Sequence, residues 1–233
     1  MRVLVACEYS GRTRDAFRLL GYDAWSCDLL PSENNQRFHL QCDVREVLND
    51  GWDLLIAHPD CTYLCSSGMH WTTRGLRDQK LTDDALEFVR LLMGAPIARI
   101  AIENPVGRIG TAIRKHDQII QPYEYGDDAS KRTCLWLKNL SLSLLRPTKR
   151  VPGRIVQYKG KLVERWSNQT DSGQNKLTPS ADRWKDRSRT YQGWSNAMAI
   201  QWGGIVMNGK TYHDWQSVIS DFDAELEQEV ETL

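Results

Sequence analysis

Short apolar runs that end in polar residues constrain the fold of this 233-residue chain most strongly. Three of them are RVLVAC (2–7), WDLLIAHP (52–59) and ARIAIENP (98–105). Stretches with helical spacing lie between them, such as RTRDAFRLLG (12–21) and LTDDALEFVRLLMGA (81–95). Apolar runs of this length are typical of strands that are buried on both faces, as in parallel sheets covered by helices. The alternation therefore predicts an α/β fold built of βαβ units around a mostly parallel sheet.

Local signals set the expected ends of several elements. Gly21 is expected to stop the first helix, and Thr82 or Asp83 is expected near the start of the next long one. The stretch YKGK (158–161) indicates a hairpin, and GWSNAMAIQWGG (193–204) indicates a helix that returns to the sheet.

The charge distribution sets the middle of the chain apart. The formal net charge is zero, yet residues 146–190 carry 12 Lys and Arg against 4 Asp and Glu, and the tail at 221–231 carries six acids. We therefore expect a first domain at 1–145, a small basic loop-rich insert at 146–186 and a C-terminal segment at 187–233. A basic lobe on a neutral chain suits a surface that binds a polyanion, and a solvated, patchy surface is the alternative.

Composition excludes several classes of protein. No run approaches the 18 or so apolar residues of a membrane span, and the N-terminus turns polar too soon for a signal peptide. Several of the cysteines lie in apolar, strand-like runs, which is typical of free thiols in a reducing compartment. We therefore expect a cytoplasmic protein without a disulfide framework. The cysteines are Cys7, Cys27, Cys42, Cys61, Cys65 and Cys134.

Polar residues that follow the apolar runs are the first candidates for a functional site, because ligands of open α/β sheets bind outside the carboxyl ends of the strands. A glycine in the first turn lets backbone approach a ligand, and an acid about 20 residues further on can hold a ribose hydroxyl. Asp28 and Asp43 occupy such positions, and ordinary turn residues are the alternative for both. The candidates are Glu8, Tyr9, Ser10, Gly11, Asp28, Asp43, His58, Pro59, Asp60, Cys61, Glu103, Asn104 and Pro105.

The order and spacing of these motifs resemble those of the carbon-5 cytosine methyltransferases. The chain looks most like the short DNA methyltransferase-like proteins often encoded by phages, over residues 2–140 and 187–204. The matching segments are VACEYSG for the first cofactor loop, CDLLP and CDV for the second and third motifs, HPDCTYLCSSG for the Pro-Cys nucleophile loop, IENPVG for the Glu-Asn-Val motif, ASKRTCLWL for the arginine motif and RSRTYQGWSNAMAIQWGG for the final segment.

The resemblance implies a Rossmann-like methyltransferase fold and methyl transfer to carbon-5 of cytosine in DNA. Cys61 would be the nucleophile, since a thiolate that adds at carbon-6 makes carbon-5 reactive. Glu103, oriented by Asn104, would stabilise or protonate ring nitrogen-3, which is acid work that calls for a raised pKa. Arg132 would contact the cytosine carbonyl, and Lys131 would contact a phosphate.

The same resemblance implies S-adenosylmethionine as cofactor and DNA as partner, with the target base extruded from the stack. It also places the protein in the cytoplasm of a bacterium or of a phage-infected host, with no membrane partner and no metal. The cofactor-binding residues would be Glu8, Tyr9, Ser10, Gly11, Asp28, Asp43, His58, Pro59 and Asn196. The nucleic-acid-binding residues would be Lys131, Lys149, Arg150, Arg154, Lys159 and Lys161.

Other interpretations of the same residues stay open. An amino-nitrogen DNA methyltransferase would carry an Asn/Asp/Ser-Pro-Pro-aromatic loop, which HPDC does not match, and the short insert leaves a free nucleotide open as acceptor. A catalytically inactive nucleic-acid-binding protein on the same scaffold is a further alternative. His58, Cys61, Cys65 and His70 form an inventory of zinc ligands, but their spacing fits no common zinc signature. Asp60 departs from the family's second proline and is expected to raise the pKa of the neighbouring thiol.

Overall fold

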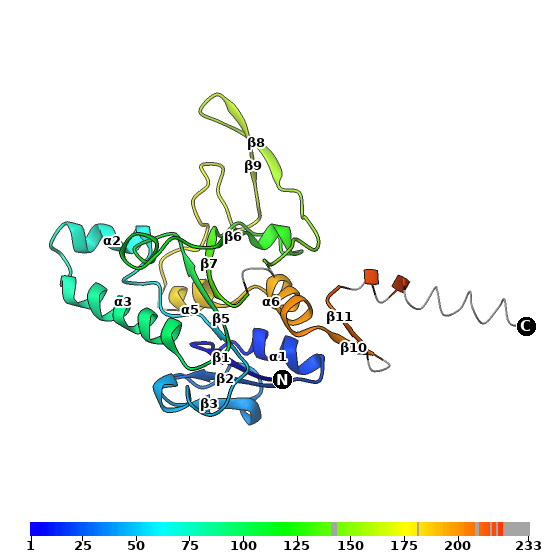
Figure 1. Ribbon diagram of the computed structural model, residues 1–233. Helices are drawn as coiled ribbons and strands as arrows, with labels where there is room; N and C mark the ends of the chain where they lie inside the picture. The colour runs from blue at the N-terminus through cyan, green and yellow to red at the C-terminus, as the bar shows by residue number, and fades with distance from the viewer. Residues whose placement is uncertain (141–143, 181, 208–209, 215, 218, 221–233) are drawn as a thin grey trace, which may run out of the picture.

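The central sheet of the computed structural model has seven strands, in the order β3-β2-β1-β4-β5-β7-β6 (Figure 1). β1 to β5 pair in parallel, and β7 runs antiparallel to both β5 and β6. The structure describes residues 1–140, 144–180, 182–207, 210–214, 216–217 and 219–220. The strands are β1 (Arg2–Ala6), β2 (Asp23–Asp28), β3 (His39–Gln41), β4 (Leu54–Ala57), β5 (Arg99–Pro105), β6 (Gln118–Ile120) and β7 (Thr133–Lys138). The expected fold class, a Rossmann-like α/β sheet, is confirmed.

Helices cover both faces of this sheet. On one face, Phe17 of α1 and Trp194 of α6 lie in one apolar cluster with Val5 of β1. On the other face, Val89 of α3 lies in a second cluster with Leu4 of β1. Neighbouring residues of β1 join different clusters because successive side chains of a strand point to opposite faces. The helices are α1 (Arg12–Leu19), α2 (Ser66–Thr73), α3 (Gln79–Gly94), α4 (Ile109–Ala112), α5 (Arg183–Ser188) and α6 (Gln192–Met198), with shorter turns η1 (Gln36–Phe38), η2 (Val44–Glu46), η3 (Pro122–Glu124) and η4 (Ala199–Gly203).

The ends of α1 and α3 can be compared with the helix ends that the sequence predicted. α1 stops as expected, because Gly21 follows its last residues with a φ of 82°, which glycine adopts without strain. α3 begins about one turn earlier than expected, so the predicted start at Thr82 or Asp83 is wrong. Asp78 caps this helix by accepting a hydrogen bond from the backbone N–H of Lys80 at 2.9 Å. Thr82 is fully buried, so the apolar period marks where the helix enters the core and not where it begins.

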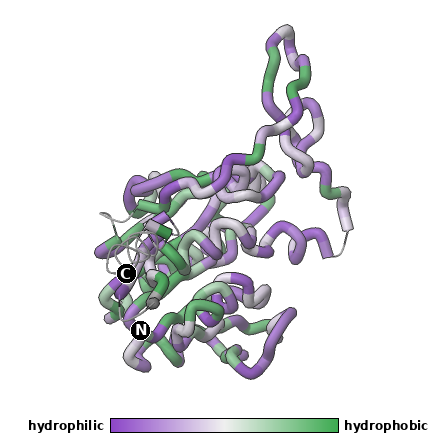
Figure 2. The backbone as a smooth tube through the Cα atoms, turned by 90° about the vertical axis from the view of Figure 1, so that its right-hand side faces the viewer, coloured by the Kyte–Doolittle hydropathy of each residue, from purple (hydrophilic) through white to green (hydrophobic). Residues whose placement is uncertain are grey.

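The insert contains a separate two-stranded antiparallel sheet of β8 (Arg154–Tyr158) and β9 (Lys161–Arg165). Lys159 and Gly160 join the strands with φ values of 49° and 75°, the positive values of a two-residue hairpin turn. The expected hairpin is therefore confirmed. Figures 1 and 2 show it standing away from the central sheet, so that it meets solvent on both faces.

The chain after the insert returns to the sheet as expected. α6 packs against α1, and a second hairpin of β10 (Ile205–Met207) and β11 (Lys210–Tyr212) follows. At the base of the insert, the ring of Trp166 stacks on that of Tyr123 with centroids 3.8 Å apart. The acidic run at 221–231 lies outside the described residues. No helix in the described part of the chain is both long and apolar enough to cross a membrane.

Candidate active site

The strand order places the predicted site at one edge of the sheet. The order reverses between β1 and β4, and ligands of open α/β sheets bind at such a reversal, outside the carboxyl ends of the strands. The first loop (residues 7–11) follows β1, and the loop of His58 to Cys61 follows β4. Glu103 and Asn104 lie at the end of β5, the next strand. Parallel pairing thus gathers at one edge of the sheet residues that lie up to about 95 positions apart in the sequence.

Glu8 is buried beneath the first loop and occupies the N-terminus of α1. Its carboxyl oxygens accept hydrogen bonds from the backbone N–H groups of Thr13 at 2.7 Å and Arg14 at 3.2 Å. In dinucleotide-binding folds, this helix end holds a pyrophosphate. Here the carboxyl group of Glu8 occupies the helix N-terminus instead. The first loop therefore presents negative charge where a phosphate would otherwise bind.

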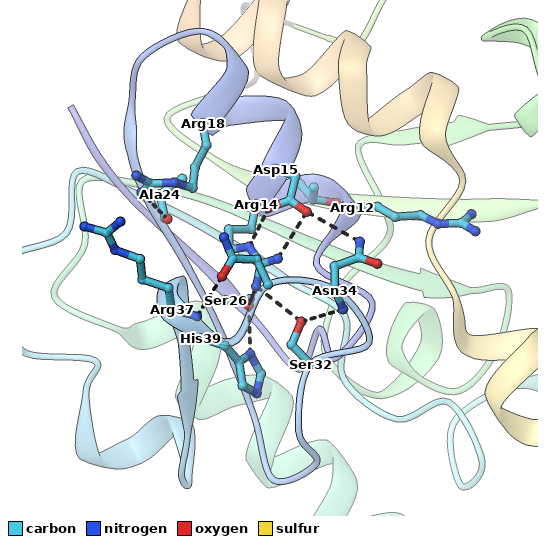
Figure 3. Close-up of polar contacts among 12 residues, drawn as sticks. Arg12, Arg14, Asp15, Arg18, Ala24, Ser26, Ser32, Asn34, Arg37 and His39 are labelled. Atoms are coloured by element: carbon cyan, nitrogen blue, oxygen red, sulfur yellow. Dashed lines mark hydrogen bonds and ion pairs between the residues drawn. The ribbon is translucent and has the colours of Figure 1, made fainter.

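Arg14 fixes the first loop against the loop that follows β2 (Figure 3). Its fully buried guanidinium donates to Ser26 at 2.9 Å and Ser32 at 3.3 Å, and it pairs with Asp15 at 2.8 Å. Gly11 has a φ of 71°, and a Cβ at that position would lie 2.4 Å from the Arg14 guanidinium. The glycine of the first loop is therefore required by the close approach of this arginine as well as by its backbone angle.

Three acids from three strand ends gather around Cys7, which directly follows β1 with a φ of 56°. Burial, followed by the charges of Asp28, Asp43 and Asp60, raises the pKa of Cys7 to about 12. Burial also raises the pKa of Asp28 above its ordinary value. Asp28 accepts from the N–H of Leu30 at 2.9 Å and Asp43 caps η2, so both also serve their own turns. Acidic side chains thus gather at the carboxyl ends of β1 to β4.

A strap of residues 183–190, which contains α5, lies across the first loop. The hydroxyl of Tyr9 donates to the carbonyl oxygen of Lys185 at 2.6 Å, and Arg12 donates to that of Thr190 at 2.8 Å. Arg189 binds both carboxyl oxygens of Glu33, in the loop after β2, at 2.7–3.1 Å. The strap therefore ties the end of the insert to both loops of the predicted cofactor site.

Two neighbouring residues of α6, Asn196 and Ser195, differ in burial and in what they contact. Asn196, a predicted cofactor residue, is exposed and accepts a hydrogen bond from Gln192 on its own helix. Ser195 is fully buried instead, and its hydroxyl lies 3.0 Å from that of Thr13 in α1. The helix therefore presents Ser195, which the sequence analysis missed, toward the start of α1.

Glu103 and His58 form a buried pair at the ends of β5 and β4. His58 Nδ1 lies 3.1 Å from Glu103 Oε2, and the side chains are 7% and 8% exposed. Asn104 Nδ2 donates to the carbonyl oxygen of Pro59 at 2.7 Å and so fixes the loop that leads to Cys61. Each of these three side chains also has one buried polar atom without a hydrogen-bond partner among the described residues: Glu103 Oε1, His58 Nε2 and Asn104 Oδ1. Unpartnered buried polar atoms are costly, so their convergence marks a place for a polar ligand.

The positive charge that lowers the pKa of Glu103 is that of Lys131, and not that of Arg132. Burial raises the pKa of Glu103, but the charge of Lys131 and the hydrogen bond with His58 outweigh it, so the pKa lies below its ordinary value. The expected raised pKa of Glu103 is therefore wrong. The charge of Lys131 also lowers the pKa of Cys61, whereas the side chain of Arg132 is exposed.

The backbone holds Cys61 and Cys65 in one tight turn, because the N–H of Cys65 donates to the carbonyl oxygen of Cys61 at 2.9 Å. The interaction with Cys65, followed by burial, raises the pKa of the Cys61 thiol, and the charge of Asp60 adds to the effect. The interactions with Cys61 and with Ser67 lower the pKa of Cys65 to about 5. Asp60 itself is exposed and accepts from the N–H of Thr62 at 2.9 Å, so its carboxyl group turns away along the loop.

The zinc interpretation finds no support in the geometry. No group of three or more potential ligands close enough to hold a metal ion occurs among the described residues. His70 is exposed and bonds to the carbonyl oxygen of Ser67 on its own helix, while His58 pairs with Glu103. These histidines therefore have separate roles.

The basic residues predicted to bind nucleic acid fall into two groups. Arg150 pairs with Glu164 and Arg154 with Asp171, each at 2.5 Å, so these arginines hold the insert together. The remaining ones on the insert are exposed: Lys149 at its base and Lys159 and Lys161 at the tip of the hairpin. Arg150 and Arg154 are exposed as well, but their charges are paired, so the three lysines are the unpaired cations of this set on the insert.

A cavity of about 620 Å³ opens beside the Cys65 loop. It lies between α2 and the turn after β5, and its lining includes Ser66, His70, Gly107 and Arg108. The cavity gives a polar approach to the edge of the sheet that carries the thiol pair.

Comparisons with known proteins give only remote structural likenesses. No protein-family model matches the chain, and no curated protein matches it. Among the solved structures that match is an Escherichia coli protein described as a "putative DNA modification methyltransferase encoded within prophage". It is 17% identical, with a TM-score of 0.40, and the alignment covers 66% of this chain and 52% of that chain. The chain thus matches about half the length of that protein.

Proposed function

We propose that the protein transfers a methyl group from S-adenosylmethionine to carbon-5 of cytosine in DNA. The observation that carries the proposal is the placement of Lys131, whose charge acts on both the Cys61 thiol and the Glu103 carboxyl group. Glu103 adds a buried oxygen that has no partner among the described residues. A nucleophile, a hydrogen-bond acceptor and a cation at one sheet edge, in the order of the family's motifs, support covalent activation of a pyrimidine.

The acidic residues at the ends of β1 to β4 suit a cationic cofactor. Asp28, Asp43 and Asp60 surround Cys7, and Glu8 fills the helix N-terminus that would otherwise attract a phosphate. This arrangement disfavours a dinucleotide and suits the positively charged sulfonium of S-adenosylmethionine. The bound cofactor would supply an electrophilic methyl group.

The residues at the end of β5 suit recognition of an extruded cytosine. With a lowered pKa, Glu103 is a carboxylate near neutral pH and accepts a hydrogen bond from the exocyclic amino group through its free Oε1. Cys61 adds to carbon-6, and the positive charge of Lys131 offsets the negative charge that develops on the ring. His58 and Asn104 hold Glu103 and the Cys61 loop in place.

The insert at 146–186 is proposed as the region that holds the nucleic acid. Its exposed lysines offer phosphate contacts, and the strap connects the end of the insert directly to the first loop. The division of the chain at 1–145, 146–186 and 187–233 stays a proposal, and its second boundary falls inside α5.

The test is a methyl-transfer assay with purified protein, labelled S-adenosylmethionine and mixed DNA, read by mass spectrometry of the nucleosides. We expect 5-methylcytosine with the native protein and none with Cys61→Ala, because the adduct requires the thiolate. Label on an amino nitrogen that survives this substitution would overturn the covalent mechanism. Absence of transfer to DNA, RNA and nucleotides would favour the inactive binding protein.

A matched pair of variants tests which cation serves the site. Lys131→Met should lower kcat about 100-fold, the usual effect of removing one charge-stabilising group. Arg132→Met, one residue away and exposed, should change kcat by less than about 3-fold. The reverse result would restore the role that the sequence assigned to Arg132.

A further inference from the structure

We propose that Cys27 and Cys42 form an oxidation site, in which a hydroperoxide converts the two thiols into a disulfide that joins the ends of β2 and β3. The disulfide weakens cofactor binding at the same edge of the sheet, and reduction restores it. The formation of the cross-link concerns the protein alone, whereas its effect on S-adenosylmethionine rests on the proposed function.

A cysteine followed directly by an acid occurs at the ends of the first three strands. The three dipeptides are Cys7-Glu8, Cys27-Asp28 and Cys42-Asp43. The acids are predicted cofactor residues, but these cysteines have no part in the proposed reaction. Each of the thiols is therefore one residue away from an acid of the predicted cofactor site.

The strand register brings Cys27 and Cys42 into contact. β2 and β3 pair in parallel with Cys27 opposite Leu40, and Leu40 and Cys42 both pack against the apolar cluster that contains Cys27. The two sulfur atoms are 3.8 Å apart, and the Cys27 thiol also donates to the carbonyl oxygen of Cys42 at 3.4 Å. Sulfur atoms in this contact need only a small movement to reach the bonded distance of about 2.0 Å.

The two thiols differ in their access to solvent. Cys27 is fully buried, whereas Cys42 is partly exposed. Burial also raises the pKa of Cys27, so this residue stays a protonated thiol. A small oxidant therefore meets Cys42 first, and Cys27 is placed to react only with the oxidised Cys42. This order is typical of a redox-sensing cysteine with a resolving cysteine beside it.

Hydrogen peroxide supplies the oxidising equivalents for the cross-link. The ionised sulfur of Cys42 attacks one peroxide oxygen, the O–O bond breaks, and the departing hydroxide takes a proton to form water. The sulfur of Cys27 then attacks the sulfur of the Cys42 sulfenic acid. An S–S bond forms, the S–O bond breaks, and the hydroxyl group leaves with the Cys27 proton as a second water. Each sulfur loses one electron, and the peroxide gains two.

The disulfide acts on the cofactor site through the two acids that follow the cysteines. It draws the sulfur atoms from 3.8 Å to about 2.0 Å apart, so the ends of β2 and β3 shift with them. Asp28 accepts from the N–H of Leu30 and Asp43 caps η2, so both carboxyl groups are held by the backbone that shifts. Oxidation therefore misplaces two predicted cofactor contacts at once.

Peptide mapping of the oxidised protein tests the cross-link. Trypsin should release Cys27 in peptide 19–37 and Cys42 in peptide 38–45, each with a single cysteine. After treatment with hydrogen peroxide and blocking of the remaining thiols, we expect these two peptides to be joined and to separate when dithiothreitol is added. Cross-links only between other cysteines, or sulfinic acid at Cys42 without a cross-link, would overturn the proposal.

Single substitutions test the order of attack. Cys27→Ala should accumulate a sulfenic acid at Cys42, which dimedone labels, whereas Cys42→Ser should leave the buried Cys27 unoxidised. Cys134→Ser, which removes another buried thiol from β7, is the matched control and should leave the cross-link unchanged. Sulfenic acid at Cys27 in the Cys42→Ser protein would contradict the role of Cys42 as the attacking thiol.

Calorimetry with S-adenosylmethionine tests the effect on the site. Oxidised native protein should bind the cofactor at least roughly tenfold more weakly than reduced protein, the effect of losing a hydrogen bond to a charged group. Dithiothreitol should restore the affinity. Cys42→Ser should keep its affinity in peroxide, and because it retains Cys61 and Cys65, oxidation of those thiols cannot account for a difference from the native protein.

The outcomes separate this inference from the proposed function. A cross-link that leaves the cofactor affinity unchanged would overturn the effect on the site. A protein that forms the cross-link but binds no S-adenosylmethionine when reduced would contradict the proposed function and leave the oxidation site standing. Reduced protein that binds the cofactor and forms no cross-link in peroxide would leave the function standing and overturn the oxidation site.

Discussion

A carboxyl group buried in a protein ordinarily gains a proton, and Glu103 does not, because Lys131 and His58 lie beside it. This balance changes the role that Glu103 can fill. An acid with a raised pKa would donate a proton to a bound nucleobase, whereas a carboxylate would accept hydrogen bonds from that nucleobase. Two neighbouring side chains therefore decide whether the same residue acts as donor or acceptor.

Glu103→Gln should reveal this balance in the pH dependence of stability. The folded pKa lies below the ordinary value of 4.5, so the ionised form stabilises the fold above that pH and the contribution is lost as the pH falls through the folded pKa. We expect the variant to be less stable than the native protein by about 1–3 kcal/mol at neutral pH, with a smaller difference in acid. Urea unfolding at both pH values measures it. A variant that is more stable at neutral pH would show that burial dominates.

At the scale of elements, the strap is held chiefly by polar contacts. α5 contributes no buried residue, and the contacts are those of Tyr9, Arg12 and the Glu33–Arg189 pair, together with a ring contact between Tyr9 and Trp184. Segments held in this way open with less free energy than core elements do. We therefore expect the strap to open more readily than the helices that cover the sheet.

A double-mutant cycle on Glu33→Gln and Arg189→Met tests how the strap is held. The two side chains are about one-third exposed, so a coupling of only about 0.5–1 kcal/mol is expected, and added salt should reduce it. Hydrogen exchange at the amide of Arg189, which bonds to the carbonyl oxygen of Lys185, reports the opening. Zero coupling would mean that the contacts of Tyr9 and Arg12 hold the strap alone.

At the scale of the whole molecule, acidic side chains gather at the carboxyl ends of β1 to β4, and the hairpin that stands away from the sheet carries exposed lysines. Under the proposed function, a cationic cofactor and a polyanion would thus bind to different parts of the molecule. The strap, at the end of the insert, contacts the first loop.

Replacing Lys159 and Lys161 together by Ala should weaken DNA binding chiefly at low salt. If each contacts one phosphate, the slope of log affinity against log salt should fall by about 1.8 in magnitude, while cofactor binding stays unchanged. Fluorescence anisotropy over a salt series measures the slope. Lys115→Ala removes an exposed lysine that precedes β6, at the opposite edge of the sheet, and serves as control. An equal change in the control would mean that the hairpin has no special role.

The alternation of apolar runs and helical stretches by itself determined the fold class, the hairpin and the sheet edge at which the polar residues meet. These features follow from local periodicity and from parallel pairing, which needs no knowledge of individual contacts. The sequence could therefore bring Cys61, Glu103 and the acids together, but it assigned Glu103 a raised pKa and left Cys65 without a role.

Only the tertiary structure decided which of two adjacent cations, Lys131 or Arg132, acts on the site, because both precede β7 and the choice depends on packing against strands and a strap that lie far away in the sequence. The same holds for Cys65, whose lowered pKa depends in part on the charge of Arg187, 122 residues further along the chain. A pKa is set by every charge and dipole within a few ångströms, and the fold, not the local sequence, decides which ones those are.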